Sequence, residues 1–190
     1  MAVPSHDLEL SIDDYLKLEE SSDIRHEYVG GRIFAMTGAT DAHNALVTNL
    51  TALIWPHVRA SGCGLYANDM KLKLSSARSF YYPDLMVSCE PYSPDSRYKE
   101  APCFIAEVLS ASTQNIDRRE KLMVYQSIAS LLNYAIVYPT ERRIELYARK
   151  GETWSVHVFA ADDVIGLSVT PQKQIHLSLG EIYQGVLPPR

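Results

Sequence analysis

The chain lacks any hydrophobic run that approaches the roughly 20 residues of a membrane-spanning helix. Its acidic start, MAVPSHDLELSIDD, does not show the basic and then apolar order of a secretion signal. Internal repeats and low-complexity tracts are absent from the sequence as well. We therefore expect a globular protein that does not bind a membrane, and we assign it to the cytoplasm.

Cysteine is scarce, with three widely spaced residues among 190 and no C-x-x-C pair. An odd count without such a pair disfavours both a disulfide framework and a zinc site. We expect Cys63, Cys89 and Cys103 to be reduced and to serve as small apolar residues. Apolar residues make up 46% of the chain and charged residues 22%, so one domain of this size can bury a core without disulfides or a structural metal.

An excess of positive charge is also missing, because the net charge is −5. Neutralisation of phosphates supplies much of the affinity of DNA-binding proteins, so this balance argues against strong non-specific binding to nucleic acid. It does not exclude a local basic cleft. Two clusters could either line such a cleft or form solvated surface: Arg118, Arg119 and Lys121, and Arg142, Arg143, Arg149 and Lys150.

The patterns that are present predict helices and strands in alternation. Residues 11–20 fit a short helix that begins after Ser11, whose side chain can cap the first turn. Residues 26–36 contain two β-prone runs on either side of Gly30-Gly31, a dipeptide suited to a tight hairpin turn. The first part of the chain is therefore predicted to be a helix followed by a hairpin.

Residues 42–60 fit a core-facing helix, with Asp41 as its cap and with Pro56 either kinking it or starting its end. Residues 102–110, PCFIAEVLS, form a nearly continuous apolar run, which is typical of a central strand covered on both faces. Further strands are predicted at 64–67, 70–74, 80–88, 132–138, 142–148, 153–159 and 173–178. A helix is predicted at 113–129, with Leu122, Met123, Tyr125 and Ile128 inward, and a last turn is predicted near 179–183. This order predicts one α/β domain over residues 1–190, with a mixed β-sheet flanked by helices.

Two carboxylates stand inside the predicted strands. Asp84 follows Pro83 at the start of an apolar stretch, and Glu107 lies within the central strand. An ionised carboxylate in such a run costs several kcal/mol unless it is paired or binds a metal. Asp84 could instead be a turn residue, and Glu107 a salt-bridged or edge residue. Together they suggest a shared hard cation such as Mg²⁺, which one or two carboxylates commonly hold.

Asp117, Lys121 and Tyr125 are spaced four residues apart on the predicted helix that follows, so they share one face. In one interpretation Asp117 and Lys121 form a surface pair that contributes only ~0.3–0.5 kcal/mol. In the other, Lys121 points towards the metal site and neutralises charge that develops on a cleaved phosphate. Both interpretations stay open on these residues alone.

The turn between that strand and helix carries Ser110, Ser112 and Thr113. Thr113 could cap the helix, and free N–H groups in such a turn suit a phosphate. A serine hydrolase that uses Ser110 or Ser112 with Lys121 is an alternative, but only proximity in sequence favours it, since the chain has no G-x-S-x-G motif.

Four segments together resemble a known family. They are PD-x-x-V at 83–87, E-V-L-S-x-S-T at 107–113, D-x-x-x-K-x-x-x-Y at 117–125 and HEYVGGRIFAMTGATDAHN at 26–44. This pattern resembles the Uma-two family, which are restriction endonuclease-like proteins of the PD-(D/E)XK nuclease superfamily. The resemblance covers roughly residues 11–149, so residues 150–190 would be a C-terminal β extension.

The resemblance implies a restriction endonuclease-like core with a site for Mg²⁺ or Mn²⁺. Asp84 and Glu107 would bind the metal, the carbonyl of Val108 would be a further ligand, and Glu27 would support the metal or a basic partner. The implied activity is metal-dependent hydrolysis of phosphodiester bonds in nucleic acid, with DNA as the expected substrate. A homodimer is expected because cutters of duplex DNA often pair two sites across a two-fold axis.

The chain departs from the superfamily at one catalytic position. The superfamily has a lysine two residues after the second acid, where this chain has Leu109. The resemblance implies that Lys121 takes its place. His43 matches a family position but could equally be a capping or packed residue, and Asn133 stands where many relatives have an acid. The main alternative is therefore a non-catalytic nucleic-acid-binding or regulatory module with a vestigial nuclease site.

Overall fold

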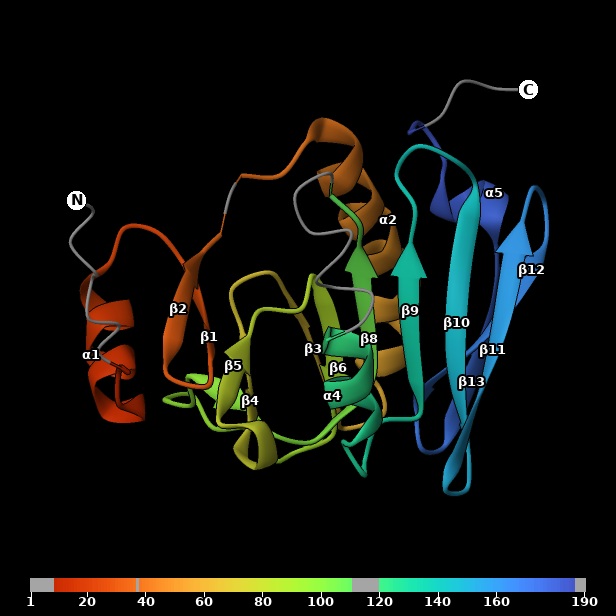
Figure 1. The fold of residues 1–190 in the computed structure, drawn as a ribbon. Coiled ribbons are helices and arrows are strands. Elements are labelled where there is room, and N and C mark those ends of the chain that lie inside the picture. The colour runs from red at the N-terminus through yellow and green to blue at the C-terminus, as the bar shows by residue number, and fades with distance from the viewer. Residues whose placement is uncertain (1–8, 37, 111–119, 187–190) are drawn as a thin grey trace.

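The computed structural model describes residues 9–36, 38–110 and 120–186, and the described strands form three sheets (Figure 1). The first sheet has the order β2-β1-β5-β4-β7, the second β11-β10-β9-β8-β6-β3, and the third is the hairpin β12-β13. The strands are β1 (His26–Val29), β2 (Arg32–Ala35), β3 (Gly64–Ala67), β4 (Lys71–Leu74), β5 (Ser79–Tyr81), β6 (Leu85–Ser88), β7 (Tyr98–Lys99), β8 (Pro102–Val108), β9 (Asn133–Val137), β10 (Arg143–Lys150), β11 (Thr153–Ala160), β12 (Val164–Thr170) and β13 (Lys173–Ser178). The helices are α1 (Ile12–Ser21), α2 (Asp41–Val58), the short 3₁₀ turn η1 (Ser75–Ala77), α4 (Leu122–Gln126) and α5 (Leu179–Ile182).

Strand β8 lies inside the six-stranded sheet, and all of its residues are buried. It pairs with β6 in the antiparallel sense and with β9 in the parallel sense. One face of this sheet packs against α2 in an apolar cluster that includes Leu46, Leu50 and Phe104. The other face packs in a second cluster that includes Ile105 and Tyr125. The predicted central strand and mixed α/β fold are thus confirmed, because a nearly continuous apolar run is typical of a strand covered on both faces.

The N-terminal helix and hairpin form as the sequence predicts. Ser11 caps α1, since its side chain accepts a hydrogen bond from Asp14 N at 3.1 Å. Gly30 and Gly31 have φ values of +55° and +97°, which non-glycine residues rarely adopt. Helix α1 docks on the five-stranded sheet through a cluster of three buried rings, Tyr15, Tyr28 and Phe80, and the ring centroids of the first two are 4.9 Å apart.

The predicted strand 80–88 is wrong, because it is two strands in two different sheets. Strand β5 ends at Tyr81 in the five-stranded sheet, and β6 begins at Leu85 in the six-stranded sheet. Pro83 lies between them and has no N–H to donate to a strand partner, so the ladder is interrupted there. Asp84 therefore lies where the chain passes from one sheet to the other.

Three smaller expectations also need correction. The cap of α2 is Thr40, whose hydroxyl accepts from His43 N at 3.3 Å, and Asp41 is the first residue of the helix. Met123 is 68% exposed because it lies two residues from both Lys121 and Tyr125 and is therefore not on the buried face that these two share. Strand β12 was not predicted, although its alternating residues Ile165, Leu167 and Val169 are buried.

Two of the three cysteines form a disulfide, which corrects the expectation that all are reduced. Strands β3 and β6 pair with Gly64 opposite Ser88, so the next step of the register brings Cys63 opposite Cys89 with Cα atoms 4.1 Å apart. Cys103 is free and buried, as expected. Sequence spacing alone gave no hint of this pairing, because 26 residues separate the two partners.

Candidate active site

The two acids singled out by the sequence lie at one end of the six-stranded sheet. In the antiparallel pair of β6 and β8, Leu85 is opposite Ala106, so one further step of the register sets Asp84 opposite Glu107. Asp84 Oδ2 accepts a 2.7 Å hydrogen bond from the backbone N–H of Val108, the residue next to Glu107. Figure 1 shows the end of β8 and the start of α2 at this same end of the sheet.

Glu107 is buried and has charged and polar partners. Its Oε1 accepts from Tyr125 Oη at 2.9 Å and lies 3.3 Å from Lys121 Nζ. Lys121 is itself only 4% exposed, and its Nζ lies 2.9 Å from Glu27 Oε1. One buried ammonium thus pairs with two carboxylates, which offsets part of the cost of burying Lys121 and Glu107. Because Lys121 is buried, the interpretation as a solvated surface pair is wrong, and Asp117 lies outside the described residues.

The local structure explains why these side chains meet. Lys121 and Tyr125 are four residues apart and share a helical face. Along β1, Tyr28 packs against α1, so the alternation of a strand turns the neighbouring Glu27 to the other side, towards Lys121. The ring of Tyr81 lies 5.5 Å from Lys121 Nζ and adds a cation–π contact.

Tyr125 acts as a hydrogen-bond donor in this cluster. Burial raises the pKa of its hydroxyl well above the ordinary value of a tyrosine, and the charge of Glu107 adds to this effect. The hydroxyl therefore keeps its proton and donates a hydrogen bond to Glu107 Oε1. A donor held in this way restricts the orientation of the carboxylate.

His43 is a site residue that the sequence reading did not select. Its Nε2 lies 3.1 Å from Asp84 Oδ2, and this contact raises the pKa of His43 although burial opposes the shift. Its Nδ1 is buried and has no hydrogen-bond partner among the residues the structure describes. His43 stands in the first turn of α2, 41 positions before Asp84, so only its match to a family position pointed to it.

The partners of the two acids come from opposite faces of the sheet. Helix α2, which carries His43, packs in the cluster that contains Phe104, whereas Tyr125 of α4 packs in the cluster that contains Ile105. Asp84 is therefore contacted from the α2 side and Glu107 from the α4 side. The link between the two sets is the end of β8, where Val108 follows Glu107 and donates its backbone N–H to Asp84.

A second buried acid, Glu19 of α1, supports the segments that carry Glu27 and Asp84. Glu19 Oε1 accepts from His26 N at 2.9 Å and from Tyr82 Oη at 2.8 Å, and its Oε2 lies 3.1 Å from His26 Nδ1. His26 precedes Glu27, and Tyr82 lies two residues before Asp84. No pattern in the sequence links Glu19 to the site.

The charges of the cluster fit a divalent cation. Asp84, Glu107 and Glu27 carry three formal negative charges and Lys121 one positive charge, which leaves −2 when His43 is neutral. In the described part of the chain, no three or more His, Cys, Asp or Glu side chains are grouped as a ready-made metal cage. Mg²⁺, however, is commonly held by one or two carboxylates, with water and phosphate as the other ligands. Asp84 and Glu107 therefore supply the oxygen donors that such an ion takes, with the carbonyl of Val108 as a predicted further ligand.

Other predicted binding residues have structural partners. Arg142 pairs with Asp162 at 3.0 Å, and Arg143 Nη2 lies 2.7 Å from Glu145 Oε1. Arg149 donates to the carbonyls of Leu131, Ile128 and Gln126. The three arginines of the second cluster thus have partners within the protein, whereas Arg118, Arg119, Ser112 and Thr113 lie outside the described residues.

Asn133, which stands where many relatives have an acid, is a structural residue in this chain. Its Oδ1 accepts from Ser168 N at 2.6 Å, and its Nδ2 donates to the carbonyl of Leu132 at 2.7 Å. It thereby ties β9 to β12. An amide suits this position because it can donate and accept, while a carboxylate can only accept.

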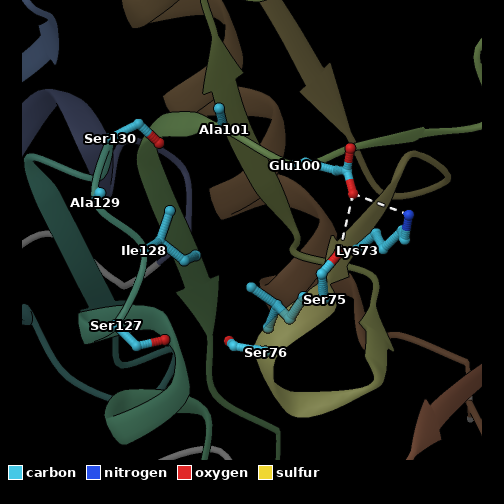
Figure 2. Close-up of a pocket in the computed structure, with 10 residues that line it drawn as sticks. Lys73, Ser75, Ser76, Glu100, Ala101, Ser127, Ile128, Ala129 and Ser130 are labelled. Atoms are coloured by element: carbon cyan, nitrogen blue, oxygen red, sulfur yellow. Dashed lines mark hydrogen bonds and ion pairs between the residues drawn. The ribbon is translucent and has the colours of Figure 1, made fainter.

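A separate pocket of about 340 Å³ lies at the start of β8, away from the two acids (Figure 2). The end of β4, the loop before β8 and the segment that follows α4 line it, and a Lys73–Glu100 ion pair of 2.9 Å lies at its side. Ser75 donates to the same carboxylate of Glu100 at 3.1 Å. None of the predicted site residues lines this pocket.

No helix in the described part of the chain is long and apolar enough to cross a membrane.

The sequence of this chain matches a protein family and individual relatives. The sequence model of the Uma2 family, described as "Putative restriction endonuclease", matches residues 12–180. The "Uncharacterized protein slr1290" of Synechocystis sp. is 32% identical over 181 residues, which cover 93% of each chain. The "Uncharacterized protein sll1609" of the same organism is 32% identical over 146 residues, which cover 75% of this chain and 82% of that protein.

A solved structure has the same fold. It is a crystal structure from Anabaena variabilis described as "a putative nuclease belonging to DUF820", and it matches with a TM-score of 0.72. The match covers 94% of this chain and 99% of that chain at 17% sequence identity. At that identity the likeness shows the shared fold, which is the restriction endonuclease-like fold that the sequence motifs predict.

Proposed function

Because the chain belongs to the Uma2 family of restriction endonuclease-like proteins, we propose that it is a metal-dependent endonuclease that hydrolyses phosphodiester bonds in DNA. Its site would consist of Asp84, Glu107, Lys121 and Glu27. The observation that carries the proposal is the buried Lys121, whose ammonium pairs with both Glu107 and Glu27. Glu107 precedes Val108, whose backbone N–H binds Asp84. A lysine on the helix after the strand thus reaches the second acid despite Leu109 at the usual lysine position.

In this proposal Asp84 and Glu107 hold Mg²⁺ or Mn²⁺, with the carbonyl of Val108 as a further ligand. When bound, the cation supplies Lewis-acid chemistry that activates water and offsets charge on the phosphate. Tyr125 orients Glu107 by donating a hydrogen bond, and Lys121 places a positive charge where negative charge develops in the transition state. Glu27 holds the ammonium of Lys121 in position from the opposite side.

The finer assignments follow from the chemistry of such a site. DNA is the proposed substrate, and the cytoplasm, where cellular DNA is accessible, is the proposed location. A homodimer would supply two sites for the two strands of a duplex. The alternative, a vestigial site in a binding module, predicts the same fold but little affinity for the metal.

The test is a cleavage assay on duplex DNA, single-stranded DNA and RNA with Mg²⁺ or Mn²⁺, run on the parent protein and on Asp84→Asn and Glu107→Gln. Both substitutions keep the shape of the side chain and remove the charge that binds a cation. Glu100→Gln is the matched control, since it removes an acid at the other end of β8. We expect cleavage by the parent and the control only, while circular dichroism shows all four proteins folded.

Equal cleavage by Glu107→Gln and the parent would disprove the mechanism. Calorimetric titration with Mn²⁺ separates the two functional alternatives. Binding that Asp84→Asn abolishes supports the nuclease, and a parent protein that neither binds the ion nor cuts any substrate supports the vestigial site.

A further inference from the structure

Strand β11 is an edge strand without the features that usually protect an edge. It is the last strand of the six-stranded sheet, and no other described strand pairs with its outer side (Figure 1). Its eight residues, TWSVHVFA, include no Lys, Arg, Asp, Glu, Pro or Gly. Its pairing with β10 runs through all eight residues without a bulge. Charges, prolines and bulges are the common means by which proteins prevent pairing at an edge, so this edge is suited to accept another strand.

The exposed side chains of β11 indicate what kind of strand would pair with it. Val156 and Val158 are 54% and 57% exposed and lie on the same face of the strand. A partner strand should therefore present apolar, uncharged side chains at the same spacing. A second copy of β11 does so. The opposite edge strand, β3, is only four residues long and is tied to β6 by the Cys63–Cys89 disulfide.

We propose that the protein forms a two-fold symmetric homodimer in which β11 of one copy pairs with β11 of a second copy in the antiparallel sense. With the axis at His157, each Val156 lies opposite Val158 of the other copy, and the four valines cover one another. Cross-strand pairs of β-branched residues stabilise an antiparallel pair. The two six-stranded sheets then continue as one sheet.

The register of the sheet relates this axis to the acids. A row of cross-strand partners runs from His157 to Leu146, Ala135 and Ala106. Glu107 is one residue beyond that row, so the two copies of Glu107 lie at nearly the same height on either side of the axis. A two-fold axis perpendicular to the sheet also keeps both sites on the same face.

The number of strands gives the distance between the two sites. From β8 of one copy to β8 of the other there are seven strand spacings of about 4.8 Å, or about 34 Å. One turn of B-form DNA is about 34–36 Å long. Two sites of one dimer would thus reach points on a duplex that are one helical turn apart. This consequence rests on the proposed nuclease function, whereas the dimer itself does not.

Sedimentation velocity across about a hundredfold range of protein concentration tests the dimer, since its population follows mass action. We expect a dimer for the parent and a monomer for Val156→Lys and Val158→Lys, because each adds a charge to the edge. Ile24→Lys, at a residue that is 53% exposed far from β11, is the control and should remain dimeric.

Cysteine cross-linking tests the register. Directly opposite residues of antiparallel strands have Cα atoms about 4.5–5.5 Å apart, which a disulfide can span. His157→Cys should therefore give a covalent dimer on oxidation. Ser155→Cys should not, because its two copies would be four residues out of register, or about 14 Å apart.

The proposal would be overturned by a parent protein that stays monomeric at all concentrations or by lysine variants that stay dimeric. Cross-linking through residue 155 but not through residue 157 would also overturn it. These readouts do not depend on catalysis. A dimer that fails to cut nucleic acid would therefore contradict the nuclease function alone, and an active monomer would contradict the dimer alone.

Discussion

Removal of the Lys121 ammonium is the most direct test of the buried charge cluster. Lys121→Met keeps the length of the side chain but leaves Glu27 and Glu107 without the charge that lies 2.9 Å and 3.3 Å from their oxygens. Loss of one member of a buried ion pair typically costs about 3–5 kcal/mol, since the remaining charge stays in a poorly hydrated place. The Glu27 side chain is 18% exposed, so water can compensate in part and we expect a loss at the low end, about 3 kcal/mol.

The assay is urea unfolding at pH 7 with a chelator present, followed by circular dichroism. The matched control is Lys73→Met, which breaks a pair between a Lys73 side chain that is 25% exposed and a Glu100 side chain that is 47% exposed. Such partly solvated pairs contribute about 0–1 kcal/mol. A loss for Lys121→Met that is no larger than the loss for Lys73→Met would refute the argument that the charges at this site are buried and interdependent.

A second arm of the same assay addresses the metal. If the acids hold a divalent cation, Mg²⁺ at about a hundred times its dissociation constant stabilises the folded protein by about 2.7 kcal/mol. We expect the Lys121→Met variant to recover stability with Mg²⁺, because the cation replaces the missing positive charge. The same addition to an Asp84→Asn protein should have little effect.

Two further predictions concern residues outside the proposed metal site. Glu19→Gln should lower the free energy of unfolding by about 1–3 kcal/mol and also weaken Mn²⁺ binding, because His26 N and Tyr82 Oη, which lie next to Glu27 and near Asp84, lose their charged acceptor. Tyr28→Phe is the control, since it removes one hydrogen bond from the same sheet to the carbonyl of Leu10. It should affect unfolding but not Mn²⁺ binding. Burial raises the pKa of the Cys103 thiol to about 11. Iodoacetamide at pH 8 should therefore leave Cys103 unmodified in the folded, non-reduced protein and label it in urea, as read by mass spectrometry. Labelling of the native protein at the rate of an exposed thiol would contradict this prediction.

Much of the fold could be predicted from short-range patterns. Helix α1, the hairpin at Gly30-Gly31 and the central strand β8 form where capping residues, turn glycines and an apolar run indicate them. The prediction failed at Tyr82–Asp84, where one apolar stretch divides between two sheets. Periodicity describes the faces of a strand but does not tell which sheet the strand joins.

For the candidate site, the sequence singled out Asp84, Glu107 and Lys121, and the tertiary structure decided which side chains touch. Asp84 and Glu107 stand out because an unpaired charge is costly in an apolar strand, and the cost is visible in the local sequence. The contacts of His43 with Asp84 and of Glu27 with Lys121 join residues that are 41 and 94 positions apart. Such contacts depend on strand register and on how helices dock on a sheet, and these result from the packing of the whole chain. Local residue patterns therefore determine the elements, while only the folded structure determines their partners.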